Sequence, residues 1–284
     1  EISECLVGSE MCIRDRFEVT LMKYKFIACD YDDTLLPKSG VISDFTKDTI
    51  REYIARGGRF AICTGRMFRS IVKIAREFGL HGEIISYQGS LIKNIDTEET
   101  LLVNYIDKDL AVDYVEFMKK QNVFPQVYVG DNLCVEKENP YSVDYARVCG
   151  VPLNVVGDFK AFFKTTDAPV NKVYCSMDSS ITEPVRNAAI KEFGDRLLIN
   201  SSKPYNVEAV DAHASKGKAV EFLANKYGIS LSDTMTFGDN LNDLQMIEVA
   251  GMGVAVGNAV DTLKNAADYI AENCEDDGVA KTIR

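Results

Sequence analysis

Short apolar runs alternate with amphipathic segments along this chain from residue 22 onward. The run Phe26–Cys29 predicts a strand buried on both faces, because apolar residues occupy both of its alternating sides. A segment at 43–56 follows, and a serine at its start and a glycine just past its end predict a helix. A second apolar run at 58–63 and a helix-forming segment at 69–78 repeat this order. Such alternation predicts an α/β fold with a parallel sheet.

Three carboxylates follow the first apolar run directly. Asp30, Asp32 and Asp33 stand within the six residues Asp30–Leu35. Ligand sites of open α/β sheets lie at the carboxyl ends of the strands. Clustered carboxylates raise one another's pKa values unless a cation holds them, and Mg²⁺ takes oxygen ligands while keeping waters for a phosphate. The segment therefore indicates a Mg²⁺ site that handles phosphate, with an Asp-rich turn as the plain alternative.

Three more polar groups stand at predicted strand ends or helix starts. The second apolar run ends in Thr64–Arg66, where a hydroxyl and a backbone N–H can hold phosphate oxygens. Lys216 opens a later amphipathic helix and can hold a phosphoryl group as a point charge. A further apolar run leads into Asp239, Asn242 and Asp243. An acid, a hydroxyl, a lysine and an acid pair in this order form a far more specific signal than any one of them alone.

A long segment of the chain separates Thr64 from Lys216. Thr64 and Lys216 lie 152 positions apart (216 − 64), which exceeds one or two strand–helix units by roughly 110 residues, an ordinary domain size. The excess predicts an inserted α+β cap over 88–200, with helices on one face of its sheet, and leaves 22–87 and 201–284 for the core. The patterns within it predict hairpins at 91–103 and 126–135, helices at 108–120 and 183–193, and strands at 170–177 and 196–200.

Together these motifs resemble those of the haloacid dehalogenase (HAD) superfamily, in particular its Cof-like hydrolases. The resemblance covers nearly everything from Met22 to the C-terminus, including the stretch Gly251–Ala259 after the fourth motif. The family's first motif, Asp-x-Asp-Gly-Thr-Leu, matches Asp30–Leu35 except that Asp33 replaces the glycine, for which Asp is one of the better alternatives. The resemblance implies a Mg²⁺-dependent phosphatase with a Rossmann-like parallel-sheet core and an inserted α+β cap.

The resemblance also implies a role for each acidic motif residue. Asp30 is expected to be the nucleophile that forms an aspartyl-phosphate. Asp32 is expected to protonate the leaving oxygen and then take a proton from water, and strand alternation predicts that it points to the same side as Asp30. The expected metal ligands are the carboxylates of Asp30 and Asp239 and the backbone carbonyl of Asp32. Asp243 is expected to support the metal shell or to position Lys216.

Other motif residues are expected to hold the substrate. Arg66 is expected to support its loop or to contact substrate, with a solvated arginine as the alternative. Tyr87 and Gln88 stand at the junction of core and cap, and the prediction leaves open whether they contact the substrate. The expected phosphate-binding residues are Tyr31, Thr64, Gly65, Lys216 and Asn242.

The composition narrows the functional classes. The formal net charge of −11 argues against nucleic-acid binding, which needs clustered Lys and Arg. The chain contains no apolar stretch near the roughly 18 residues of a membrane span. Its eight cysteines are scattered, which favours a reducing cytoplasm over a disulfide framework. The only histidines, His81 and His213, argue against a His-based zinc site or Ser-His catalysis.

Residues 1–21 stand apart from the rest. They carry no periodic pattern and precede Met22, which is a natural start. The stretch Cys5–Arg16 resembles translated adapter read-through from sequencing, and it lacks the basic start and apolar centre of a signal peptide. We expect a non-native or disordered extension there and leave it out of the fold prediction.

Rival functions share parts of this pattern. A signalling receiver domain also combines acids, a hydroxyl and a lysine, but has about 120 residues in one compact unit without an insert. A phosphomutase on the same scaffold would return the phosphoryl group to its substrate. A scaffold that only binds is disfavoured, because all four motifs are present. The expected partner is a small phosphorylated metabolite such as a sugar phosphate, FMN or pyridoxal phosphate, with no nucleic-acid or membrane partner, and the sequence leaves the oligomeric state open.

Overall fold

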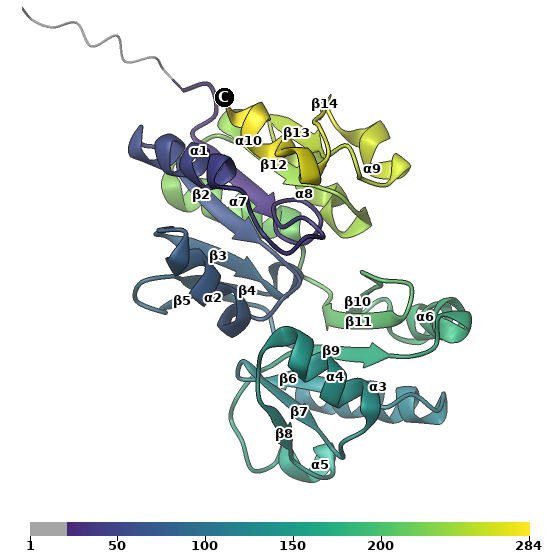
Figure 1. Ribbon diagram of the computed structural model, residues 1–284. Coiled ribbons are helices and arrows are strands. Elements are labelled where there is room, and N and C mark those ends of the chain that lie inside the picture. Colours follow the sequence, from purple (N-terminus) through teal and green to yellow (C-terminus); the bar gives the residue numbers. More distant parts are fainter. Residues whose placement is uncertain (1–21) are drawn as a thin grey trace, which may run out of the picture.

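The computed structural model describes residues 22–284, and the predicted extension at 1–21 lies outside this part of the chain. The described residues form two sheets, which occupy the upper and lower halves of Figure 1. The first sheet is eight-stranded, in the order β14-β13-β12-β1-β2-β3-β4-β5. Its strands are β1 (Phe26–Asp30), β2 (Arg59–Cys63), β3 (Glu83–Ser86), β4 (Leu91–Asn94), β5 (Thr100–Val103), β12 (Thr234–Gly238), β13 (Met252–Ala255) and β14 (Tyr269–Ile270).

Strand β1 occupies the centre of this sheet, as its composition predicts. It pairs in parallel with β12 on one side and β2 on the other, and all five of its residues are buried. Ile27 and Cys29 face a hydrophobic cluster that includes α1 (Asp44–Ala55) and α2 (Phe68–Glu77). Phe26 and Ala28 face the opposite cluster, which includes α7 (Lys216–Tyr227). The predicted parallel α/β core is therefore confirmed.

The second sheet is six-stranded among the described residues, in the order β10-β11-β9-β6-β7-β8. One of its faces packs against α3 (Lys108–Lys120), α5 (Phe159–Phe162) and α6 (Ser179–Phe193). Its other face joins the cluster of the first sheet, through Tyr128, Tyr174 and α4 (Pro140–Cys149). The strands are β6 (Gln126–Val129), β7 (Asn132–Val135), β8 (Leu153–Val155), β9 (Val170–Ser176), β10 (Leu197–Asn200) and β11 (Asn206–Asp211).

Strand pairing corrects the predicted limits of the insert at 88 and 200. The hairpin β4–β5 extends the first sheet, because β4 pairs antiparallel with β3. Strand β11 pairs with β9 and β10 in the second sheet rather than returning to the core. A hairpin pattern shows that two strands pair with each other, but it does not show which sheet edge they join. We call the part of the chain from α3 to β11 the insert.

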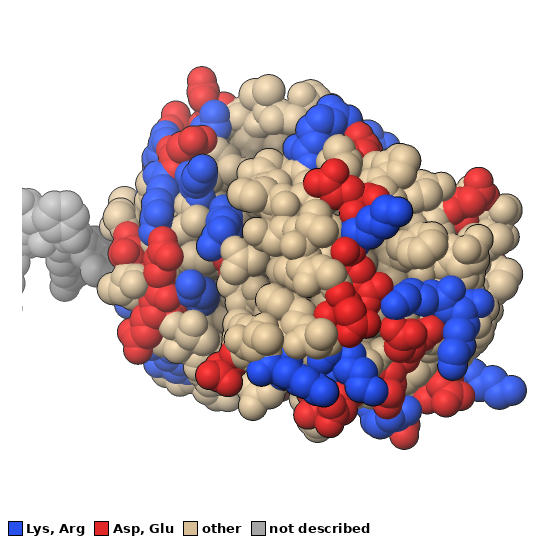
Figure 2. Space-filling view, turned by 90° about the horizontal axis from the view of Figure 1, so that it is seen from below, with Lys and Arg blue, Asp and Glu red and all other residues tan. Residues whose placement is uncertain are grey.

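The remaining helices complete the layers of the core. Helix α10 packs on α1, and α8 packs on α7. Within residues 22–284, none of the helices is both long enough and apolar enough to cross a membrane. Seen from below, the molecule carries interspersed acidic and basic side chains around a broad surface of other residues (Figure 2). These last helices are α8 (Leu244–Val249), α9 (Asp261–Ala266) and α10 (Gly278–Ile283).

Candidate active site

Asp30 and Lys216 meet at the carboxyl end of β1. Asp30 is the last residue of the strand and Lys216 the first of α7, a helix that Ser215 caps by accepting a hydrogen bond from the Lys218 N–H. Lys216 Nζ donates to Asp30 Oδ1 at 2.5 Å and to Asp243 Oδ1 at 2.6 Å, and all three side chains are buried. Burial raises the pKa of Asp30 well above its ordinary value, and Asp243 adds to this rise while Lys216 opposes it. The lysine thus orients a buried carboxylate at the strand end.

Asp239 completes a cluster of carboxylates that can hold a divalent cation. One carboxylate oxygen from each of Asp30, Asp239 and Asp243 lies within 4.8 Å of the others. Burial, with the nearby charge of Asp243, raises the pKa of Asp239 to about 6. A bound cation would relieve both effects, because it stabilises the charged forms. Oxygen donors gathered in this way fit a hard divalent metal ion.

Asp243 anchors the lysine instead of offering a free ligand. Its Oδ1 accepts from Lys216, and its Oδ2 accepts from the backbone N–H groups of Asp239 and Asn240 at 3.0 and 3.1 Å. Gly238 permits this close turn, since a Cβ there would lie 2.5 Å from the Cβ of Asp243. Both oxygens of Asp243 are therefore engaged, which leaves Asp30 and Asp239 as the carboxylates that face a cation.

The turn after β2 brings the second motif beside this cluster. Thr64 is fully buried, and its Oγ1 accepts from the Arg66 N–H at 3.1 Å. Gly65 packs closely against Gln88, because a Cβ on Gly65 would lie 2.4 Å from the Gln88 side-chain nitrogen unless that side chain shifted. Gln88 Oε1 in turn accepts from Asn242 Nδ2 at 3.0 Å. Gln88 thereby links the second motif to the fourth.

Asp32 lies apart from the carboxylate cluster. Arg66 binds its carboxylate through two hydrogen bonds, and the Asp32 side chain remains 40% exposed. The alternation that aligned Asp32 with Asp30 in the prediction does not apply, because β1 ends at Asp30. Tyr31 packs into the hydrophobic cluster with its ring centroid 5.0 Å from the Arg66 guanidinium. The Tyr31 ring is thus packed in the core, and the phosphate contact predicted for this residue stays a prediction that only its backbone could meet.

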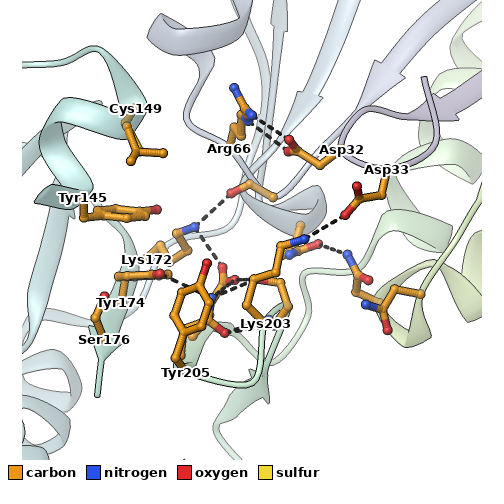
Figure 3. A pocket seen from close by; sticks show the side chains of 18 of the residues that line it. Asp32, Asp33, Arg66, Tyr145, Cys149, Lys172, Tyr174, Ser176, Lys203 and Tyr205 are labelled. Carbon is orange, nitrogen blue, oxygen red and sulfur yellow. Dashed lines mark hydrogen bonds and ion pairs between the residues drawn. The ribbon is translucent and has the colours of Figure 1, made fainter. Parts of the chain in front are cut away.

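A cavity of about 440 Å³ opens between the first sheet and the insert. Asp30, Asp239 and Arg66 line it on the side of the first sheet. Figure 3 shows that the insert supplies the opposite wall with tyrosines and lysines. The sequence prediction missed this wall. Its residues include Tyr145 and Cys149 from α4, Lys172, Tyr174 and Ser176 from β9, and Lys203 and Tyr205 from the loop between β10 and β11.

Asp33 connects the first motif to the insert. It has a φ of 61°, a left-handed conformation that glycine adopts without cost. Its Oδ2 accepts a hydrogen bond from Lys203 Nζ at 2.7 Å, the contact drawn between the two labelled residues in Figure 3. The aspartate that replaces the usual glycine is thus accommodated, and its side chain forms an ion pair across the cavity.

The comparisons with known proteins agree with this geometry. The family model for haloacid dehalogenase-like hydrolases matches residues 27–283. The chain belongs to this family. A putative phosphatase of Streptococcus pyogenes is 30% identical over 93% of this chain and 98% of its own length. The putative phosphatase YxeH of Bacillus subtilis is also 30% identical, over 92% of this chain and 97% of its own.

Solved structures of family members have the same fold. A haloacid dehalogenase-like hydrolase from Bacteroides thetaiotaomicron superposes with a TM-score of 0.82 at 29% identity, covering 92% of this chain and 98% of its own. A Thermotoga maritima protein gives 0.79 at 27% identity, covering 92% and 96%. The family and the fold class predicted from the sequence are confirmed, and so is the enzyme class, a hydrolase of the phosphatase type.

Proposed function

We propose that this enzyme hydrolyses small phosphate monoesters through an aspartyl-phosphate on Asp30, with Mg²⁺ as its cofactor. The observation that carries the proposal is the placement of Asp30. Its carboxylate ends the central strand, is held by Lys216 at 2.5 Å and faces the cavity beside Asp239. Enzymes are known to use an aspartate carboxylate as the nucleophile of covalent catalysis.

The reaction divides into two displacements at phosphorus. In the first, an oxygen of Asp30 forms a bond to phosphorus while the bond to the leaving oxygen breaks, and Asp32 gives that oxygen a proton. In the second, Asp32 takes a proton from a water whose oxygen attacks phosphorus, and the bond between phosphorus and Asp30 breaks. The products are the alcohol and free phosphate, and both aspartates return to their initial state.

The surrounding groups would hold the phosphoryl oxygens during both steps. We assign this role to the Thr64 hydroxyl, the Gly65 N–H, the Lys216 ammonium and the Asn242 amide. Fixed donors aimed at the charge that develops on those oxygens are the main source of catalysis in phosphoryl transfer. Mg²⁺, bound by the Asp30 and Asp239 carboxylates and the Asp32 carbonyl, would neutralise phosphoryl charge when present.

The cavity supports a small metabolite as the substrate. Its wall on the insert combines tyrosine rings with Lys172 and Lys203, which suits leaving groups that carry both apolar and polar surface. A relative from Bacillus subtilis, 30% identical over 92% of this chain, is named 5-amino-6-(5-phospho-D-ribitylamino)uracil phosphatase. Sugar phosphates, FMN and pyridoxal phosphate remain our proposed substrate range.

A cytoplasmic location also remains part of the proposal. The six cysteines within residues 22–284 are free, and five of them are buried. Buried thiols without disulfides suit a reducing compartment.

A panel of phosphorylated metabolites tests the activity and separates a phosphatase from a phosphomutase. We expect phosphate release with Mg²⁺ and its loss in EDTA, because the carboxylates need a cation before an anionic phosphate can approach. Release of free phosphate supports a phosphatase, whereas an isomeric phosphate ester as the product would support a mutase. Undiminished turnover of the metal-free protein would falsify the assignment.

A further inference from the structure

Lys172 is a buried cation of the insert that contacts the turn after β2, the turn that carries Gly65. It stands in β9, and its side chain is 2% exposed. Its Nζ donates to the backbone carbonyl of Gly65 at 2.9 Å and to Glu208 Oε2 at 2.8 Å. The first of these bonds joins residues 107 positions apart in the chain. Figure 3 shows Lys172 between the tyrosines of the insert and the turn that carries Arg66.

The surroundings of Lys172 fix its position. Its ammonium lies 5.1 Å from the ring centroid of Tyr128, 5.5 Å from that of Tyr174 and 6.0 Å from that of Tyr87. Aromatic faces at such distances attract a cation. Glu208, the partner of Lys172, is itself held by the Ser202 hydroxyl through its Oε1. A buried ion pair with this many partners costs desolvation that a purely apolar packing would avoid, which points to a function for the pair.

A chain of hydrogen bonds leads from Lys172 to the hydroxyl of Thr64. The Gly65 carbonyl that accepts from Lys172 belongs to the same peptide group as the Arg66 N–H. That N–H donates to Thr64 Oγ1 at 3.1 Å. A cation on the carbonyl polarises the peptide and strengthens its N–H as a donor. With its oxygen engaged as an acceptor, the Thr64 hydroxyl keeps its proton free to donate to another group.

We propose that Lys172 is a positioning residue for phosphoryl transfer: through the Gly65–Arg66 peptide it sets the orientation of the Thr64 hydroxyl. The inference rests on the proposed function, and it assigns to the insert a part in assembling the phosphate site. The phosphate-binding turn is then complete only when the insert lies against the core. Direct contact between Lys172 and the leaving group is the competing role, because Lys172 also lines the cavity.

The two roles differ in how the effect depends on substrate. A positioning residue acts on the phosphoryl group that every substrate shares, so its loss lowers kcat/KM by the same factor for each. A residue that contacts the leaving group affects each substrate differently. We therefore compare p-nitrophenyl phosphate, glucose 6-phosphate and FMN, and measure inhibition by orthovanadate, a phosphoryl mimic that has no leaving group.

The variants are Lys172→Met, and Lys172→Met combined with Glu208→Gln, which leaves no unpaired charge behind. Lys119→Met is the matched control, because Lys119 is a lysine of α3 that pairs with Glu116 and Glu136 and does not line the cavity. We expect Lys172→Met to lower kcat/KM uniformly by about 10- to 100-fold, the range seen when a residue that orients a reacting group is lost. Orthovanadate inhibition should weaken by a similar factor, and the double variant should remain as impaired.

Four results would overturn the inference. One is unchanged orthovanadate inhibition and turnover in Lys172→Met. Another is a loss that differs widely between substrates, which would place Lys172 against the leaving group. A third is recovery of activity together with melting temperature in the double variant, which would show a structural role alone. Wild-type protein that hydrolyses none of the three esters with Mg²⁺ would instead overturn the proposed function, and this inference with it.

Discussion

The Arg66 guanidinium donates two hydrogen bonds to the Asp32 carboxylate, from Nε to Oδ2 at 2.9 Å and from Nη2 to Oδ1 at 2.5 Å. Both carboxylate oxygens of Asp32 are therefore engaged by the guanidinium. The proposed mechanism requires Asp32 to give a proton to the leaving group, so the pair has to loosen when substrate binds. An incoming phosphate dianion is a suitable competitor, because guanidinium groups bind phosphate in the same bidentate way.

Asp32→Asn should therefore separate the two chemical steps. The amide oxygen can still accept a hydrogen bond from Arg66, so the fold should persist. With p-nitrophenyl phosphate, whose leaving group needs no proton, we expect a burst of about one equivalent of nitrophenol. Steady turnover should fall by about 10²- to 10⁴-fold, the usual contribution of a general base. Rapid-mixing absorbance measurements check both phases, and steady turnover at the wild-type rate would show that another group activates the water.

Asp30→Asn should abolish nitrophenol release from p-nitrophenyl phosphate altogether, with neither an initial burst nor steady turnover. The change is nearly isosteric, but it removes the carboxylate that attacks phosphorus. Asp233→Asn provides a matched control, since Asp233 forms an exposed ion pair with Lys25 at the amino end of β12. The control should retain full activity, and both proteins should remain folded by calorimetry. Residual turnover of Asp30→Asn near the wild-type rate would require a different nucleophile.

The strand ends could be predicted because each follows a short apolar run. Burial on both faces favours parallel strands, and parallel strands bring their carboxyl ends to one edge of the sheet. The structure shows that β1 pairs in parallel with β2 and β12. Asp30, Thr64 and their downstream partners therefore had to meet. The argument from strand alternation does not reach Asp32, because β1 ends at Asp30. Both residues line the cavity, and the role expected of Asp32 stays a prediction.

The wall of the cavity was missed for two different reasons. Helix α4 carries local signals, since Asn139 caps it, Pro140 begins it and Gly150 ends it in a left-handed conformation, so a closer reading of capping residues would have found it. Lys172 stands next to Asn171 in a strand that is otherwise mostly apolar, and a lysine in such a strand is unusual. Its partners, however, lie 36 and 107 positions away, and sequence spacing does not show such contacts.

Asp239→Asn should change how stability depends on pH. The folded-state pKa of about 6 lies above the ordinary value of 3.8, so the folded protein holds this proton more tightly than the unfolded chain does. As pH rises from 3.8 through 6, the folded state loses up to about 3 kcal/mol relative to the unfolded state, at 1.36 kcal/mol per pKa unit. The variant has no such loss. In EDTA, its advantage in free energy of unfolding should grow from near zero at pH 4 to its maximum at pH 7.

Mg²⁺ supplies the control for this prediction. At pH 7 the ion should raise the melting temperature of the wild type, because it binds the folded state alone, and it should leave Asp239→Asn nearly unchanged. Urea titrations at a series of pH values measure the first effect, and calorimetry with and without Mg²⁺ measures the second. A difference between variant and wild type that stays constant from pH 4 to pH 7 would contradict the raised pKa of this carboxylate, which its burial and the charge of Asp243 cause.

Asp33→Gly should have opposite effects on stability and on substrate binding. Glycine takes the left-handed conformation of this position without the strain that other residues meet, so the free energy of unfolding should stay the same or increase. The change also removes the ion pair with Lys203, which spans the cavity between core and insert. If this pair helps to hold the insert over the site, KM for metabolite esters should rise while kcat for p-nitrophenyl phosphate changes little.

A double-mutant cycle with Lys203→Met isolates the pair itself. The two side chains are 46% and 23% exposed, so solvent screening limits their coupling to about 0.2–1 kcal/mol, which corresponds to at most about a fivefold change in KM. Asp33→Gly and Lys203→Met should each raise KM for the metabolite esters, and the double variant should raise it by less than the product of the two single effects. Strictly multiplicative effects would show that Asp33 and Lys203 act independently. Closure of the insert would then depend on the buried contacts of Lys172 rather than on this pair at the edge of the cavity.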